Sequence, residues 1–272
     1  MTSTEVVQLL VALRRDLRIA TLTRLALIGL FAFGLVAAAA ATDERLRLTW
    51  LWTVTMVAAI IWALLTIAST KQIRAANQAS AHLASGRLDL AESQLRTALR
   101  IFSIYSPAKL LACHNLAVLA HGRGEFIAAA ELCTGVLRQA RRLGGSARRT
   151  TRMLLADCKL SLNDVVAANA ALQGLDVMDE RMPLSERLML LPIRVRCDVT
   201  AGSHEVAVQQ LREKVRLAEL LESPRAALVH ALLARACRCL GRPAEAEFLH
   251  ARACLLHDLA DLYEQVPLLK EP

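Results

Sequence analysis

Two long stretches near the start of the chain contain no charged residue, residues 25–42 and residues 48–70. A helix rises about 1.5 Å per residue, so the second stretch would be about 34 Å long, enough to cross a ~30 Å hydrocarbon core. The first stretch can span a bilayer if it borrows residues before Arg24. Only residues 43–47 separate the two stretches. The pattern therefore predicts an antiparallel transmembrane hairpin over residues 25–70.

The basic residues around this hairpin predict its orientation, because positive flanks stay in the cytoplasm. The flank before the first stretch carries Arg14, Arg15, Arg18 and Arg24. The flank after the second stretch carries Lys71, Arg74 and Arg87. In the turn, Arg45 and Arg47 are balanced by two acids, and Trp50 and Trp52 suit an interfacial anchor. We expect an integral inner (plasma) membrane protein of bacterial type with both termini cytoplasmic.

Small residues at four-residue spacing favour close approach of the two helices. They are Gly34 with Ala38 and Ala59 with Ala63, although an alanine-rich chain produces such spacing without any such role. Two alternatives to the hairpin remain. Val36 followed by the alanines 37–41 resembles a signal-peptidase site. Two apolar helices can also be the core of a soluble protein.

Residues 1–24 form a separate amphipathic and basic segment. Its apolar face contains Val6, Leu9, Leu10, Leu13 and Leu17. Thr2 and Glu5 have the spacing of a capping box. The segment is expected either to lie in the membrane interface or to extend the first transmembrane helix.

The rest of the chain, residues 71–272, repeats with one register. Glycine is scarce, yet four of five register positions carry it, at spacings of 38, 39, 39 and 39 residues: Gly86, Gly124, Asn163, Gly202 and Gly241. Five residues after each comes Ala91, Ala129, Ala168, Ala207 or Ala246. Seven residues before each comes Ala79, Ala117, Ala156, Val195 or Ala234. The pairs Ser106-Pro107 and Ser223-Pro224, which suit helix starts, recur 117 residues apart.

Each repeat reads as two helices joined at the Gly or Asn, where the backbone can adopt a left-handed conformation. Five such units predict an all-α solenoid with a closing helix after Ala253. This pattern resembles the tetratricopeptide repeat (TPR) family. It consists of a small residue before the turn, an apolar or aromatic residue after the turn, and the alanine that follows. The units are longer than the 34 residues usual in that family, and Pro192, His204 and Pro243 depart from its pattern. Another αα-solenoid is the structural alternative.

Composition supports helices and excludes several classes. Hydrophobic residues make up 55% of the chain and aromatic residues 4%, with only 11 glycines and 7 prolines among 272 residues. These values argue against disorder and against a β-sandwich or barrel. The seven cysteines form no CxxC pair, so we expect buried, reduced thiols rather than disulfides or a zinc site.

Motifs for catalysis are missing from the sequence: it has no P-loop, GxGxxG, HExxH or GxSxG. His114 with His121, and His250 with His257, are each seven residues apart but lack a third ligand. We therefore expect neither an enzyme, nor a cofactor, nor a metal site.

The TPR resemblance implies a groove, lined by the first helix of each unit, that binds proteins or peptides. Carried over by register, its candidate residues are Asn77, Ser80, His114, Asn115, Asp157, Arg196, Arg235 and Arg238. Arg196 and Arg235 are 39 residues apart, and stacked guanidinium groups would suit an acidic peptide.

A run of arginines flanks Gly144-Gly145 without an intervening acid. It consists of Arg138, Arg141, Arg142, Arg148, Arg149 and Arg152. Such a loop can remain solvated, contact anionic lipid or bind nucleic acid, although interleaved aromatic residues for stacking on bases are lacking.

The sequence thus predicts a membrane-anchored, TPR-like scaffold or adaptor that holds partner proteins at the cytoplasmic face. Two alternatives remain. One is a subunit of an oligomeric membrane complex, with the solenoid used for assembly and homo-oligomers formed. The other is a regulator that binds nucleic acid through the arginine loop.

Overall fold

Helices are the main secondary structure of the residues that a computed structural model of the protein describes, namely 2–40, 44–102, 105–139, 143–258, 260–262, 266 and 269. Within these residues there is no strand, as the sequence predicts. The chain divides into two compact units, Met1–Arg148 and Arg149–Pro272, each of which is described by itself.

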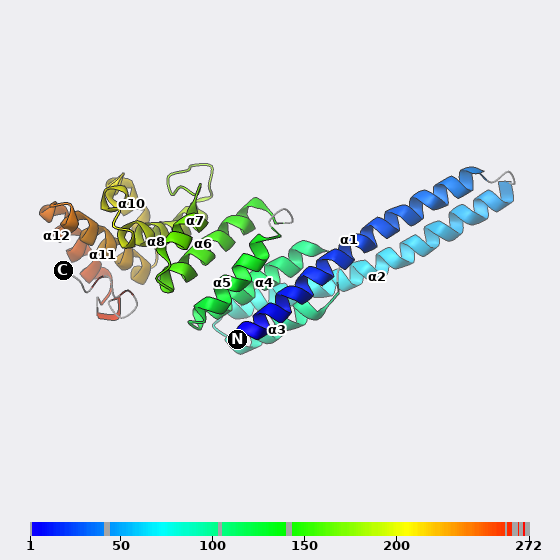
Figure 1. Cartoon of the computed structure of the whole chain (residues 1–272), viewed down its shortest axis with the longest axis horizontal. Coiled ribbons are helices and arrows are strands. Elements are labelled where there is room, and N and C mark those ends of the chain that lie inside the picture. Colours follow the sequence, from blue (N-terminus) through cyan, green and yellow to red (C-terminus); the bar gives the residue numbers. More distant parts are fainter. Residues whose placement is uncertain are drawn as a thin grey trace. The chain divides into compact units, whose positions relative to one another are not determined.

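The first unit begins with two long helices, α1 (Ser3–Ala40) and α2 (Glu44–Ala84), which run side by side in opposite directions (Figure 1). Both are long and apolar enough to cross a membrane, with mean hydropathies of 2.0 and 2.1 over their most apolar windows. Their paired ends expose large apolar side chains, among them Ile28, Phe33, Trp52 and Leu64. In a pair of core helices of a soluble protein these side chains would be buried. Their exposure therefore argues against that alternative.

The two helices lie close together at Gly34. A Cβ atom added there would lie 2.6 Å from a methyl carbon of Val54, and Ala38, one turn further, is only 3% exposed. The predicted role of this pair is confirmed. It is wrong for Ala59 and Ala63, which are exposed, because four-residue spacing defines a stripe on a helix but not which way the stripe faces.

The first half of α1 is continuous with its apolar second half and packs against the helices that follow α2. Val6, Leu13 and Leu17 are buried, and α1 contacts α4 (Ser106–Gly122) and α5 (Phe126–Leu137). Gly135 of α5 lies so close that an added Cβ would be 2.3 Å from a Leu10 methyl carbon. Of the two expectations for residues 1–24, the extension of the first long helix is therefore the one observed.

The start of α1 has the predicted capping box. The backbone N–H of Glu5 donates to Thr2 Oγ1 at 3.3 Å, and the backbone N–H of Thr2 donates to Glu5 Oε2 at 3.2 Å. These two bonds satisfy amides that a helix start leaves without intrahelical partners.

A buried ion pair fastens α1 to α4. Lys109 is 1% exposed, and its Nζ donates to Asp16 Oδ2. A buried ammonium is stable only when its charge is compensated, so this contact fixes where α1 crosses α4.

All five register positions adopt the predicted left-handed turn. Their φ angles lie between 59° and 76° at Gly86, Gly124, Asn163, Gly202 and Gly241. At each turn the amide of the following residue donates back to the carbonyl five residues earlier, as in Glu125 to Ala120 at 2.9 Å and Asp164 to Lys159 at 2.9 Å. This is the Schellman arrangement, which satisfies the last carbonyls of the first helix while the chain reverses.

Each turn joins the two helices of one hairpin. In the first unit, α2 is followed by α3 (Leu88–Arg100), and α4 by α5. In the second unit the pairs are α6 (Gly145–Ser161) with α7 (Val165–Leu172), α8 (Leu184–Thr200) with α9 (His204–Val208), and α11 (Ser223–Cys239) with α12 (Pro243–Leu256). The alanines five residues after each turn are at most 2% exposed, and so are the small residues seven before it. Small buried residues allow the helices to pack closely.

The fourth hairpin departs from the repeat. Its second helix stops at Val208, Gln210 adopts φ 54°, and α10 (Leu211–Ala218) follows. The Nζ of the buried Lys214 donates to the carbonyls of Val206 at 2.9 Å and Ala207 at 2.7 Å, which satisfies the broken end of α9. The sequence did not predict this break, because Gln210 is not a residue that usually marks a left-handed turn.

Three prolines occupy the helix position expected of them. Pro107, Pro224 and Pro243 lie in the first turn of α4, α11 and α12. Pro192 instead lies inside α8, where it has no N–H to donate to the helix. After α12, residues 260–262 are helical, and Leu262 is buried. Leu259, part of the expected closing helix, lies outside the described residues.

The Asp16–Lys109 pair should contribute strongly to the stability of the first unit. Asp16→Leu leaves a buried ammonium unpaired and is expected to lower the free energy of unfolding by about 3 kcal/mol. The double change Asp16→Leu and Lys109→Met should recover most of that loss. Denaturation of the full chain in detergent, followed by circular dichroism, measures both. Arg18→Gln, at an exposed position of the same helix, is the matched control. An Asp16→Leu variant as stable as the double variant would contradict the assignment.

Candidate functional site

In the first unit, polar side chains link the first helices of neighbouring hairpins. Asn115 Nδ2 of α4 donates to Ser80 Oγ of α2 at 2.9 Å, and the Ser80 hydroxyl donates to the Ala76 carbonyl at 3.1 Å. Asn77 is exposed one turn before Ser80. The predicted candidates on α2 and α4 are thus brought together, at partly open positions.

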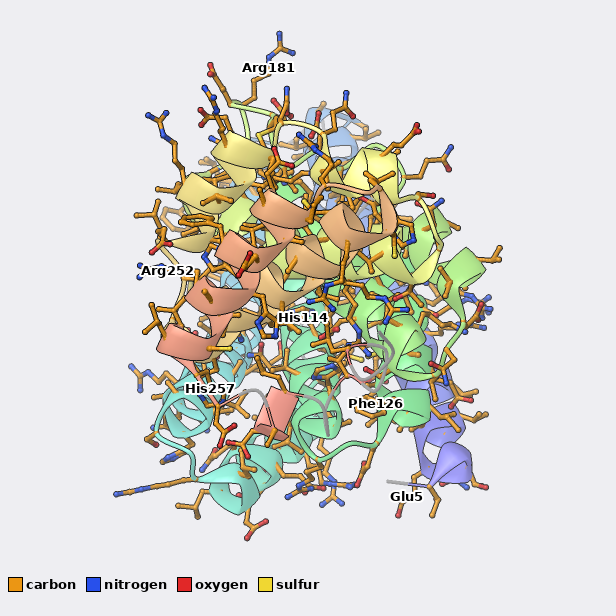
Figure 2. The ribbon with its side chains drawn as sticks, turned by 90° about the vertical axis from the view of Figure 1, so that its left-hand side faces the viewer. Glu5, His114, Phe126, Arg181, Arg252 and His257 are labelled. Carbon is orange, nitrogen blue, oxygen red and sulfur yellow. The ribbon has the colours of Figure 1, made fainter. Side chains whose placement is uncertain are left out.

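His114, labelled in Figure 2, lies on α4 beside Asn115 and is partly buried. Burial lowers the pKa of its imidazole below the ordinary value of 6.5. A neutral imidazole both donates and accepts hydrogen bonds, so at neutral pH His114 contributes no charge to this surface.

In the second unit, an ion pair joins two residues that share one register position. Arg196 Nη1 of α8 lies 3.4 Å from Asp157 Oδ1 of α6. Both lie six residues before their turns, at positions 39 residues apart, so the pair links the first helices of successive hairpins. Asp157 thus engages Arg196 across these two helices, and the expected stack of Arg196 on Arg235 stays a prediction.

The last turns of α11 hold the other two candidates of this unit. Arg235 is partly buried, whereas Arg238, one turn further, is exposed. Arg238 is therefore the candidate arginine with the greatest access to solvent, and its guanidinium can form paired hydrogen bonds with a carboxylate.

The described residues of the arginine run fall into two groups, one exposed to solvent and one bonded within the second unit. Arg138 and Arg148 are exposed, and Arg141 and Arg142 lie outside the described residues. Arg149 forms an ion pair with the buried Glu186, Nε to Oε2 at 2.5 Å, and this bond raises the pKa of the guanidinium. Arg152 Nε donates to the Ala171 carbonyl at 2.8 Å, and its Nη2 donates to the Gln173 carbonyl.

Arg149 and Arg152 thus have structural contacts within the second unit. Arg149 ties α6 to the start of α8, and Arg152 satisfies carbonyls at the end of α7, as cations at helix ends do. The expectation of a basic surface loop is corrected for these two residues, because a distant carboxylate and free helix carbonyls engage them.

A further polar cluster was missed by the sequence reasoning. Arg252 of α12 binds Glu219 through Nε at 2.9 Å and Nη2 at 2.6 Å, and His230 Nε2 lies 3.3 Å from Glu219 Oε1. The bond from Arg252 lowers the pKa of Glu219. Burial lowers the pKa of His230, which is fully buried in α11. These residues are 11 to 33 positions apart in sequence and share no motif, so nothing in the sequence signalled them.

The thiols follow the prediction in five cases of seven. Cys113, Cys133, Cys158, Cys197 and Cys237 are buried, and burial raises the pKa of Cys113 to about 12. Cys239 and Cys254 are exposed instead, because their helices turn these positions toward solvent. Among the described residues no group of three His, Cys, Asp or Glu could hold a metal ion.

No known protein family matches the chain, and comparison with curated proteins and with solved structures finds no match either. What the candidate surface offers chemically therefore comes from its residues. Amide and guanidinium donors on the first helices suit hydrogen bonding to carboxylates and peptide carbonyls.

The buried histidines should make stability depend on pH. Burial lowers the pKa of His230 below 6.5 in the folded chain. As the pH falls, the unfolded chain therefore binds a proton at His230 before the folded chain does. Stability is full above about pH 6.5 and is lost as the pH falls below it, by at most about 1.4 kcal/mol per pH unit for one histidine.

Thermal unfolding of the full chain at pH 8 to pH 5 measures this loss. His230→Leu should flatten the dependence, because it removes the buried imidazole. An unaltered slope in His230→Leu would contradict the argument.

Proposed function

We propose that the protein is a membrane-anchored, TPR-like scaffold that binds partner proteins on the cytoplasmic face of the membrane. The observation that carries the proposal is the recurrence of one left-handed turn five times at 38- or 39-residue spacing. Regular helical hairpins of this kind bury their apolar sides against neighbours and leave an extended face for binding.

The stacking of first helices supports the solenoid. In the first unit α2 contacts α4, and in the second unit α8 contacts α11. The bonds Asn115–Ser80 and Arg196–Asp157 connect first helices across successive hairpins. Such contacts align the first helices of consecutive repeats in a row, which is the surface that TPR-like proteins use for peptides.

The exposed apolar halves of α1 and α2 support the membrane anchor. A soluble protein rarely exposes contiguous apolar surface of this extent, whereas lipid covers it at no cost. The basic flanks favour a cytoplasmic helical domain. Anchoring restricts the domain to a surface and raises the local concentration of whatever it binds.

The topology can be tested with thiols the protein already has. Cys239 and Cys254 are exposed in the second unit, and the five other thiols are buried. A membrane-impermeant maleimide should label them only after cells are permeabilised. Arg45→Cys, at an exposed position in the first turn of α2, should react in intact cells. Labelling of Cys239 and Cys254 in intact cells would overturn the proposed topology.

The binding face can be tested at Arg238. Arg238→Glu reverses an exposed charge on the candidate face and should reduce capture of acidic partners about tenfold, the loss expected for one hydrogen-bonded charge pair. Arg225→Glu, exposed near the start of the same helix, is the matched control. Capture from the native membrane with the full chain, quantified for each partner, measures both. Equal capture by the two variants would contradict the assignment of this face.

A further inference from the structure

A groove runs along one side of the α1–α2 pair, in the first unit. It consists of two pockets, of about 500 Å³ and about 590 Å³. Three lining residues, Leu27, Ile28 and Trp62, belong to both pockets, so the two are continuous. Among the residues that the structure describes, no acidic side chain lines either pocket.

One end of the groove is polar. Its lining residues there are Arg24, Thr66, Ser69, Thr70 and Tyr105. The hydroxyls of Thr66, Ser69 and Thr70 each donate to the carbonyl four residues earlier at 2.8 Å. With their protons engaged, these oxygens can still accept hydrogen bonds from a ligand, while Arg24 supplies positive charge.

The other end of the groove is apolar. It is lined by Phe31, Ala32, Leu35, Thr55, Ala58 and Ala59. From Thr66 to Thr55 the α2 axis rises about 16 Å, at about 1.5 Å per residue. One leaflet occupies half of a ~30 Å hydrocarbon core, or about 15 Å. The groove therefore has the length of an acyl chain that begins at the polar end.

We propose that this groove binds one anionic phospholipid of the cytoplasmic leaflet, with its phosphate beside Arg24 and one acyl chain along Leu27, Trp62 and Ala59. The proposal rests on the proposed membrane anchoring. A headgroup with hydroxyl donors, such as that of phosphatidylglycerol, fits the accepting oxygens of the Thr66–Thr70 turn. Charge, accepting oxygens and groove length together select such a lipid over a zwitterionic one and over free phosphate.

Native mass spectrometry of the full chain, with equal amounts of phosphatidylglycerol and phosphatidylcholine in the detergent, tests the assignment. We expect phosphatidylglycerol to be retained preferentially at one lipid per chain. Arg24→Gln should weaken its binding about tenfold, the fold-change for losing one hydrogen bond to a charged group. Ala59→Trp, which fills the apolar end, should weaken it similarly without altering charge.

Two matched variants serve as controls. Arg18→Gln removes an exposed arginine earlier in α1, and Ala63→Trp adds the same bulk at an exposed position of α2 outside both pockets. Neither should change lipid retention. Inorganic phosphate in excess should not displace the lipid, because it lacks the acyl chain.

Three results would overturn the inference: equal retention of the two lipids, unchanged retention in both Arg24→Gln and Ala59→Trp, or displacement by phosphate. Maleimide labelling of the same variants separates this inference from the proposed function. A chain with the expected topology but no lipid preference overturns the lipid site alone, whereas a chain that is not in the membrane overturns both.

Discussion

The helical hairpins depend on a single backbone requirement, a residue with positive φ at the end of each first helix. At these turns the amide after the residue bonds to a carbonyl five positions earlier, so the chain reverses without leaving the helix end unsatisfied. The reversal packs the second helix against the first, with a buried alanine in one and a buried small residue in the other, for example Ala129 in α5 and Ala117 in α4. Close packing, and hence the repeat, follows from where the turn falls.

A second constraint joins the long apolar helices to the domain. The N-terminal half of α1 lies on α4 and α5, and the buried Lys109 draws Asp16 into that contact. In α2, the fully buried Gln72 donates to the Ala98 carbonyl of α3 at 2.9 Å. Polar bonds thus hold both long helices to the neighbouring helices α3 and α4. Such bonds fix the positions of the helices more specifically than apolar contact alone.

The features that the sequence predicted are those set by local backbone chemistry or by long apolar runs. The five turns, the capping box at Thr2 and the two long helices are of this kind. The direction in which Ala59 faces depends on the rotation of α2 against α1, which spacing does not encode. Arg149 was assigned to a loop surface, but its partner Glu186 lies 37 residues away and no pattern connects them. The break at Gln210 depends on Lys214, a residue that composition alone would place on the surface.

The continuity of α2 has a mechanical consequence. It extends from Glu44 to Ala84 as one helix, and its last turns form the first hairpin with α3. Helical domains on flexible tethers sweep a hemisphere of radius set by chain length. Here α2 itself forms part of the first hairpin. In a bilayer this hairpin would therefore lie at a fixed distance from the membrane and rotate only together with α2. A change in the tilt of α2 within the lipid would then rotate the first hairpin. Because helix tilt adjusts to bilayer thickness, the orientation of this hairpin would depend on that thickness.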